Sequence, residues 1–234
     1  MKRVLEKYQP VDLSHPLHPG IPTWSGGCGF NLEVKLDYPK GLRVQSLKCY
    51  AGVGTHMDAP NHFIEGSWDI SEIPLENLIV PLYVIDVREK MDPDLFIQPE
   101  DLLAFEKVHG TIQEGSAFFA HTGWSQFWEE PEKYRNIDEK GVMHFPGFSK
   151  EAAELLLDRK VVGIGIDTLS PDGANNGPGA EFPVHLAMLR AKKYIIENLA
   201  FLEKVPAKCA FVIALPPRSC AATESQARIL ALVS

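Results

Sequence analysis

Gly54-Thr55-His56-Met57-Asp58-Ala59-Pro60-Asn61-His62 places two imidazoles and a carboxylate within seven residues of the chain. Alternate side chains of an extended segment point the same way, so we expect His56 and Asp58 to share one face of a strand. Pro60 fixes φ and sets the direction in which the chain carries His62. Imidazole and carboxylate are common zinc ligands, and imidazole is also a general acid or base. From these residues alone, a metal site and a surface loop that happens to contain two histidines both remain open.

An expected hairpin leads into this motif. Residues 30–37 alternate apolar and polar side chains, which is typical of a half-buried strand. Residues 42–50 would pair with them through the turn-prone Pro39-Lys40-Gly41. This hairpin would deliver the chain to the motif at Gly52.

Strands and helices are mixed in the rest of the chain. Apolar runs predict strands at residues 78–87, 117–120, 161–166, 210–215 and 228–233. Helices are predicted at residues 99–107, 124–134, 149–157 with Ser149 as N-cap, and 185–193. The pattern therefore predicts the α/β class.

A second pair of candidate ligands lies late in the chain. His185 and Glu197 are twelve residues apart, which on one continuous helix would place them about 120° apart. The basic Lys192-Lys193 suits a helix C-terminus, and the Tyr194-Ile195-Ile196 run that follows is β-prone. We therefore predict His185 at the start of a short helix and Glu197 at the end of a short strand. A capping role for His185 with a solvated Glu197 also remains open.

The motif GTHxDxPxH resembles the signature of the cyclase family of metal-dependent hydrolases, which includes kynurenine formamidase and isatin hydrolase. Similar family stretches are Asp12-Leu13-Ser14-His15-Pro16-Leu17, Thr122-Gly123-Trp124, residues 163–170, His185 and Glu197-Asn198-Leu199. The resemblance spans most of the chain and implies the swivelling β/β/α fold, in a single domain of residues 1–234. The family's full pattern is HxGTHxDxPxH, and here Gly52 stands in place of its first histidine.

The resemblance also implies a site. His56, Asp58, His185 and Glu197 would hold a divalent ion, zinc or manganese. Because Gly52 has no side chain, we expect one ion per chain, with a second weak or absent. The implied reaction is hydrolysis of a small amide or cyclic amide, in the manner of an arylformamidase or an isatin hydrolase.

In that reaction the ion would lower the pKa of a bound water and so provide hydroxide as the nucleophile. His62 would act as the proton shuttle. An apolar wall for an aryl substrate would come from Trp24, Phe63 and Trp68, although simple core packing explains these three side chains equally well.

Two alternatives remain at this stage. Because of Gly52, the chain could be a catalytically altered or silent member of the family that binds a metal or another ligand. It could also be a lyase or dehydratase that uses the metal as a Lewis acid on a hydroxy acid. The sequence contains neither a GxSxG nor a GxxxxGK[ST] motif, which removes the common serine hydrolases and P-loop enzymes.

Composition limits the partners. The net charge of −8 argues against a nucleic-acid partner, which would need a basic stripe. There is no polybasic anchor, no apolar run long enough to cross a bilayer, and no apolar core after Met1-Lys2-Arg3 of the kind a signal peptide has. We therefore expect a cytoplasmic protein that acts on a small molecule and does not bind a membrane.

Cysteines and the N-terminus give two further expectations. The four cysteines form no CxxC pair, and we expect them to be reduced, buried and inert. The family commonly assembles as dimers or larger oligomers. The Pro-rich N-terminal arm, about residues 1–29, would be hard to bury in its own domain, so we expect it to contact a neighbouring subunit.

Overall fold

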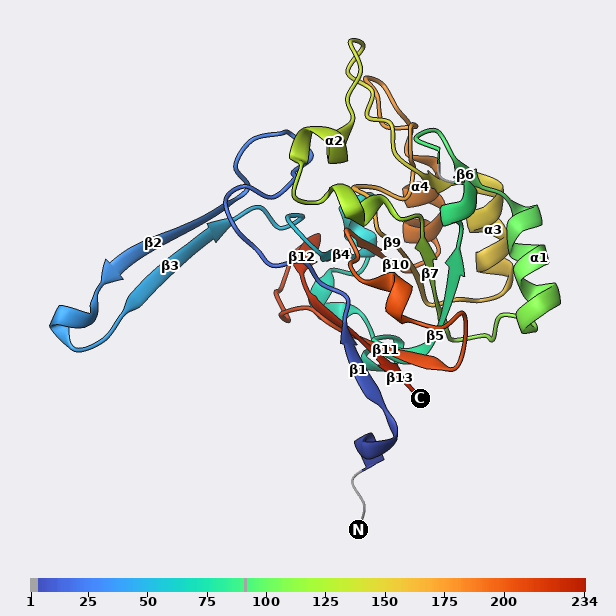
Figure 1. Ribbon diagram of the computed structural model, residues 1–234, viewed down its shortest axis with the longest axis horizontal. Helices are drawn as coiled ribbons and strands as arrows, with labels where there is room; N and C mark the ends of the chain where they lie inside the picture. Colours follow the sequence, from blue (N-terminus) through green and yellow to red (C-terminus); the bar gives the residue numbers. More distant parts are fainter. Residues whose placement is uncertain (1–3, 91) are drawn as a thin grey trace.

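A curled sheet forms the body of the molecule (Figure 1). The computed structural model describes residues 4–90 and 92–234. The strands of the main sheet are β1 (Gln9–Asp12), β4 (His56–Asp58), β5 (Ile79–Asp86), β7 (Ala117–His121), β9 (Gly163–Ile166), β10 (Tyr194–Glu197), β11 (Ala210–Leu215), β12 (Glu224–Gln226) and β13 (Arg228–Val233). Within the described residues these nine strands lie in the order β1-β13-β11-β5-β7-β9-β10-β4-β12. The segment β5-β7-β9-β10 is parallel, and the strands on both sides of it pair antiparallel.

Among the described residues, four α-helices and several 3₁₀ turns accompany these strands. The α-helices are α1 (Pro99–His109), α2 (Pro131–Arg135), α3 (Lys150–Asp158) and α4 (Pro183–Arg190). The 3₁₀ turns are η1 (Val4–Lys7), η2 (Tyr38–Lys40), η3 (Pro60–His62), η4 (Ile70–Glu72), η5 (Leu75–Asn77), η6 (Arg88–Lys90), η7 (Trp124–Phe127) and η8 (Leu202–Lys204). In the part of the chain that the structure describes, none of these helices has the length and apolarity that crossing a bilayer requires.

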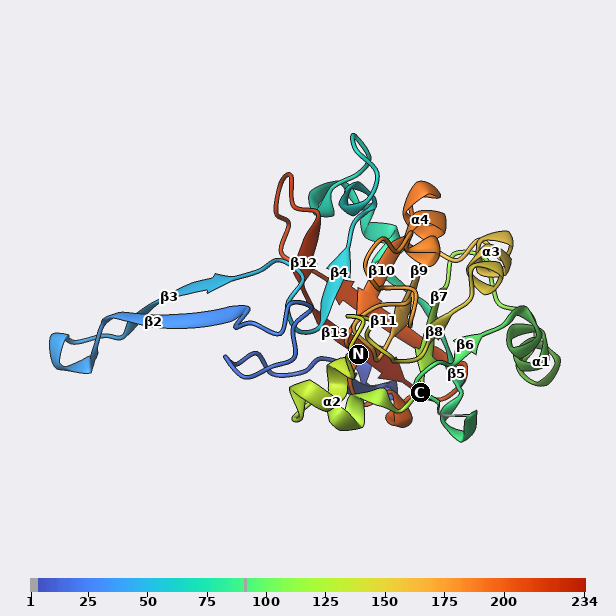
Figure 2. The same ribbon diagram turned by 90° about the horizontal axis from the view of Figure 1, so that it is seen from above.

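The two faces of the parallel strands bury different cores. One face packs against α1, α3 and α4, whose Leu102, Leu156 and Met188 are fully buried. These helices lie together on one side of the molecule (Figure 2). The other face contributes to a second cluster, which joins Met57 of β4 to Val212 of β11. Because β4 and β11 are far apart in the strand order, the sheet must curl around this second core.

The N-terminal segment packs on its own chain. β1 pairs with β13, and Leu13 is fully buried. Ile21 joins a third apolar cluster with Trp124 and Phe145, and Leu17 packs against it. Val11, Leu13 and Ile21 are therefore buried within their own chain, whereas Trp24 of the same segment is 41% exposed.

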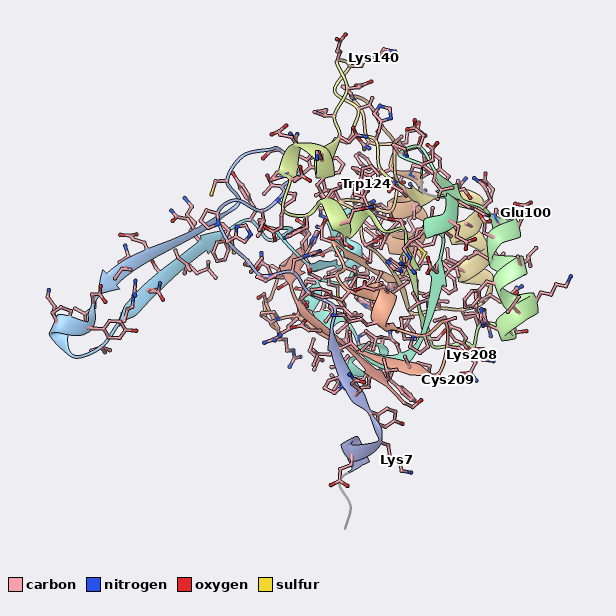
Figure 3. All side chains as sticks on the ribbon, in the orientation of Figure 1. Lys7, Glu100, Trp124, Lys140, Lys208 and Cys209 are labelled. Carbon is pink, nitrogen blue, oxygen red and sulfur yellow. The ribbon has the colours of Figure 1, made fainter. Side chains whose placement is uncertain are left out.

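The predicted hairpin forms, with a different environment from the one expected. β2 (Phe30–Leu36) pairs with β3 (Val44–Cys49) through η2. The strand is not half-buried, since Leu32 and Val34 are 49% and 42% exposed. Figures 1 and 3 show the hairpin projecting from the body, with side chains on both of its faces directed into open space. A further small pair is β6 (Phe96–Ile97) with β8 (Gly147–Phe148).

Most of the other predicted elements are confirmed, including the five strands predicted from residue 78 onward, which are β5, β7, β9, β11 and β13. Ser149 caps α3 by accepting a hydrogen bond from the Ala152 amide at 3.1 Å. A single helix at residues 124–134 is wrong: η7 ends at Phe127, and α2 begins at Pro131. Proline has no amide hydrogen and obstructs the preceding turn, so it can begin a helix but does not continue one. The expectation of buried thiols is also wrong, because three cysteines are exposed and one is partly exposed.

Candidate metal centre

β4 lies between two neighbours that both bring acidic side chains to it. His56 is opposite Glu197 in β10, and Asp58 is opposite Glu224 in β12. Directly opposed residues of an antiparallel pair project to the same face of a sheet. His56 and Asp58 also share that face, as the motif predicts, and their Nε2 and Oδ1 atoms are 3.4 Å apart.

The four residues that the sequence predicts as ligands come together. His56 Nε2 lies 3.3 Å from Glu197 Oε2 and 3.4 Å from Asp58 Oδ1. His185 Nε2 lies 3.3 Å from Glu197 Oε1 and 3.5 Å from Asp58 Oδ2. Each carboxylate therefore spans the two imidazoles, and all four side chains are buried.

Hydrogen bonds at the far side of each ring orient the two imidazoles. His56 Nδ1 lies 2.8 Å from the Gly54 carbonyl oxygen, which can only accept, so Nδ1 carries the proton. His185 Nδ1 lies 2.5 Å from Asp172 Oδ2, and the Asp172 carboxylate also accepts from the backbone amides of Val184 and His185. This assignment leaves both Nε2 lone pairs free for a metal, the arrangement that usually surrounds a ligating histidine.

The charges of the cluster fit a cation. Asp58 is 1% exposed, and neither of its oxygens has a hydrogen-bond partner among the described residues. Burial alone would raise the Asp58 pKa, but His56 and His185 outweigh it and hold that pKa far below its usual range. Burial opposes the charging of His56 and His185, yet the surrounding carboxylates hold both pKa values well above the usual range. A buried carboxylate that has no hydrogen-bond partner and is stabilised by neighbouring positive charge is typical of a metal site.

The distances also suit coordination. One ligand atom each from His56, Asp58 and Glu197 lies within 4.8 Å of the others. Ligands about 2.0–2.2 Å from one zinc ion lie at most about 4 Å apart. The four contacts of 3.3–3.5 Å satisfy that limit with little movement.

Backbone contacts lock the early motif to the late corner. Asn198, which follows Glu197 with a left-handed φ of 56°, donates from Nδ2 to the Gly54 carbonyl at 2.9 Å. Thr55 Oγ1 donates to the Asn198 carbonyl at 2.6 Å. Gly54 has φ +70°, a conformation in which any other residue would be strained, and a Cβ there would also lie 2.3 Å from Leu17 Cδ2. The predicted places of His185 near a helix start and Glu197 at a strand end are confirmed.

A cavity of about 510 Å³ opens onto the cluster. Of the three predicted aromatic residues, Trp24 and Phe63 line it, and Phe63 stacks on His185 with ring centroids 4.7 Å apart. Trp68 does not line this cavity; its ring lies 4.6 Å from Lys192 Nζ. Phe182, which the sequence reasoning missed, is a third aromatic wall and has a left-handed φ of 49°.

His62 and Glu224 lie at the edge of the same cavity. His62 ends η3 and is partly buried, with its Nδ1 atom 3.6 Å from Glu224 Oε2. Burial and the nearby Asp58 carboxylate raise the Glu224 pKa. No local motif marks Glu224 in the sequence, because its position depends on the pairing of β12 with β4.

Known proteins resemble this chain in sequence and in fold. Residues 11–173 match the family model Cyclase, whose description is "Putative cyclase". The chain is 36% identical to an isatin hydrolase from Roseibium aggregatum, over 77% of this chain and 71% of that protein. The chain belongs to the cyclase family. It is also 28% identical to a kynurenine formamidase from Bordetella petrii, over 92% of this chain and 91% of that one.

The solved structures agree with the sequence matches. An isatin hydrolase A from Ralstonia solanacearum superposes with a TM-score of 0.90 at 30% identity, and covers 98% of this chain and 93% of its own. The expected α/β fold of the cyclase family is therefore confirmed.

Proposed function

We propose that this protein is a metal-dependent hydrolase that opens a C–N bond of a small amide or cyclic amide. The observation that carries this proposal is the buried group of His56, Asp58, His185 and Glu197 at the floor of a cavity. The relatives named isatin hydrolase and kynurenine formamidase support the reaction class.

The four buried residues would hold one divalent ion. Imidazole and carboxylate suit both zinc and manganese. When bound, such an ion supplies a Lewis acid for the amide carbonyl and an activated water. The chain itself keeps both Nε2 atoms free, through Asp172 and the Gly54 carbonyl, and excludes solvent from the carboxylates.

His62 is the residue that moves protons. Its ring is partly buried beside the ligand cluster, with its centroid 6.1 Å from that of His185. It can therefore take a proton from an attacking water and deliver one to the leaving nitrogen.

The test of this role is His62→Ala with metal retained. Turnover should fall on the order of 10²- to 10⁴-fold, as it does when other acid–base groups are lost, while the divalent ion stays bound. His109→Ala, at the end of α1, is the matched control. Unchanged turnover of the His62 variant would remove His62 from the mechanism.

The cavity wall favours an aryl substrate. Trp24, Phe63 and Phe182 present apolar rings above the cluster, with Phe63 and Phe182 in edge contact at 5.7 Å. We therefore expect isatin or an aryl formamide to be cleaved faster than an aliphatic formamide of equal size. Phe63→Ala should raise KM for the aryl substrate more than for the aliphatic one.

Metal analysis separates this proposal from a silent relative. A hydrolase of this kind should purify with, or gain on reconstitution, about one zinc or manganese ion per chain, and a bound ion should raise Tm. No bound ion, with no stabilisation by added zinc or manganese, would favour the silent member suggested by Gly52.

We also propose a homodimer or higher oligomer. The support is the exposed apolar surface of the β2–β3 hairpin and of Trp24, since single chains seldom leave contiguous apolar patches uncovered. That the N-terminal arm, about residues 1–29, contacts a neighbouring subunit stays a prediction; residues 1–3 of it lie outside the described residues. Light scattering coupled to gel filtration should give at least twice the chain mass, and a monomer would contradict the proposal.

A further inference from the structure

Tyr134 is fully buried and lies in a hydrogen-bond network that reaches the predicted ligand His56. Its hydroxyl donates to the carbonyl oxygen of Asp167 at 2.9 Å and to Oδ1 of Asn198 at 3.0 Å. Burial holds the pKa of this hydroxyl well above its usual range, so it remains a donor at neutral pH. One hydroxyl proton is therefore shared between two acceptors, which directly follow the ends of β9 and β10.

Aromatic packing holds the Tyr134 side chain in place. α2 begins at Pro131 and carries Tyr134 into the third apolar cluster. Trp124 Nε1 donates to the Tyr134 carbonyl oxygen at 2.8 Å, and the Trp128 ring meets the Tyr134 ring edge-on, with centroids 5.2 Å apart. Because both the backbone and the ring are held, the position of the hydroxyl is set by packing as well as by its hydrogen bonds.

The Asn198 amide connects Tyr134 to the backbone beside His56. Its Oδ1 accepts from the Tyr134 hydroxyl, and its Nδ2 donates to the Gly54 carbonyl at 2.9 Å. A hydroxyl that donates on one side and a carbonyl that accepts on the other allow only this orientation of the amide. The same Gly54 carbonyl accepts from His56 Nδ1 at 2.8 Å. A continuous series of hydrogen bonds therefore runs from Tyr134 to His56.

We propose that Tyr134 is a positioning residue for the metal centre, which acts through Asn198 and the Gly54 carbonyl to hold the Nε2 lone pair of His56 towards the ion. The inference rests on the proposed function, because it takes His56 as a ligand. Tyr134 does not line the cavity. Its hydroxyl therefore acts on the ligand set without contact with the ion or the substrate, and its loss should weaken metal binding without removing a ligand.

Tyr134→Phe, which keeps the ring and removes the hydroxyl, tests the proposal. Calorimetric titration of the metal-free full-length protein with zinc chloride should show an affinity that is lower by roughly 2- to 10-fold, the effect of one neutral hydrogen bond. Tyr194→Phe is the matched control, because Tyr194 is 1% exposed and its hydroxyl has no hydrogen-bond partner among the described residues. Ser149→Ala, which removes the buried N-cap bond of α3, controls for a general loss of stability. Both controls should bind zinc as the wild type does.

A double variant shows whether Tyr134 acts through Asn198. Asn198→Ala should weaken zinc binding by more than Tyr134→Phe does, because it also removes the donor to the Gly54 carbonyl. In the Asn198→Ala background, Tyr134→Phe should cause no further loss of affinity, whereas the losses of two independent sites would add.

Proton exchange gives a readout that needs no metal. Nuclear magnetic resonance of the metal-free protein should show the His56 Nδ1 proton exchanging with solvent roughly 2- to 10-fold faster in Tyr134→Phe than in the wild type, because the acceptor of its hydrogen bond is held less firmly. Tyr194→Phe should leave this exchange rate unchanged.

The outcomes separate the two proposals. A wild type that binds no zinc would contradict the proposed function, and the proton exchange would still decide the role of Tyr134. Unchanged zinc affinity and unchanged exchange in Tyr134→Phe would overturn the positioning role and leave the function untouched. Additive losses in the double variant, or a loss of affinity in Ser149→Ala as large as in Tyr134→Phe, would also overturn that role.

Discussion

β4 and the β2–β3 hairpin follow one another in the chain and have opposite surroundings. β4 is three residues long, is paired on both sides, and is buried at every position. The hairpin strands are longer, pair with no other strand of the described chain, and are exposed along most of their length. In β4 the polar side chains of His56 and Asp58 are enclosed, whereas in the hairpin the apolar side chains of Leu32 and Val34 face solvent. The comparison teaches that an alternation of apolar and polar residues predicts an extended backbone. Whether the apolar side chains are buried depends on which distant segments pack over the strand.

The largest difference between the two regions should appear with a matched pair of Asp→Asn changes. Asp58→Asn removes a buried charge that two imidazoles and the ion share, so zinc affinity should fall by more than about 100-fold, beyond the loss seen when only an outer partner is removed. Asp37→Asn, beside the hairpin turn, should leave affinity unchanged. Calorimetry measures both. Equal affinities for the two variants would contradict the site.

The next effect concerns pH and His15, whose amide donates to Thr55 Oγ1 just before β4. Its ring stacks on Trp128 at 3.9 Å, and burial lowers its pKa from 6.5 to about 4. The His15 ring of the folded protein therefore stays unprotonated at pH values where the same ring in the unfolded chain already binds a proton. This contribution to stability is full above pH 6.5 and is lost as pH falls towards about 4.

The size of that contribution follows from the pKa difference and is at most about 3 kcal/mol. Urea unfolding at several pH values should show a smaller acid loss for His15→Phe, which keeps the stacking, than for the wild type. Parallel pH profiles for the two proteins would exclude His15 as the cause.

A smaller effect on zinc affinity is expected at Asp172, which contacts the predicted ligand His185. Asp172 holds His185 Nδ1 and the first amides of α4. Asp172→Asn should lower zinc affinity by roughly 10- to 100-fold, because the ring loses its fixed orientation. Asp94→Asn, which faces the distant His144, is the control for losing a histidine–carboxylate contact. An affinity loss as large as that of Asp58→Asn would mean that Asp172 acts directly on the ion.

The smallest effect should come from the hairpin. Leu47 is 55% exposed on its own chain, so Leu47→Ala should change the free energy of unfolding of an isolated subunit by no more than about 0.5 kcal/mol. Met57→Ala, in β4, should cost about 2–5 kcal/mol because it opens a cavity in the curled-sheet core. A loss above about 2 kcal/mol for Leu47→Ala, with a smaller particle in light scattering, would show that another subunit covers the hairpin.

The sequence predicted the local half of the site well. The motif places His56 and Asp58 on one face through the two-residue period alone, and the structure confirms it. The change from the basic Lys192-Lys193 pair to β-prone residues located the end of a helix and the strand that ends at Glu197. Each of these inferences needed only neighbours in sequence.

What the sequence could not provide depends on pairing between distant segments. Asp172 lies in a polar loop whose function could be suspected, but its contact with His185 needs the folded loop. Glu224 reaches the site only because β12 pairs with β4, and no local pattern encodes that register. Trp68 and Phe63 look alike in the sequence, yet only Phe63 lines the cavity.

The Gly54 carbonyl accepts hydrogen bonds both from His56 and from Asn198, and so joins the two ends of the ligand set. During synthesis, when a chain forms from its N-terminus onward, the hairpin can close as soon as it leaves the ribosome, but the set of four predicted ligands is incomplete until β10 has emerged. Nascent or truncated chains that stop before Glu197 would therefore hold at most His56, Asp58 and His185 of the four predicted ligands.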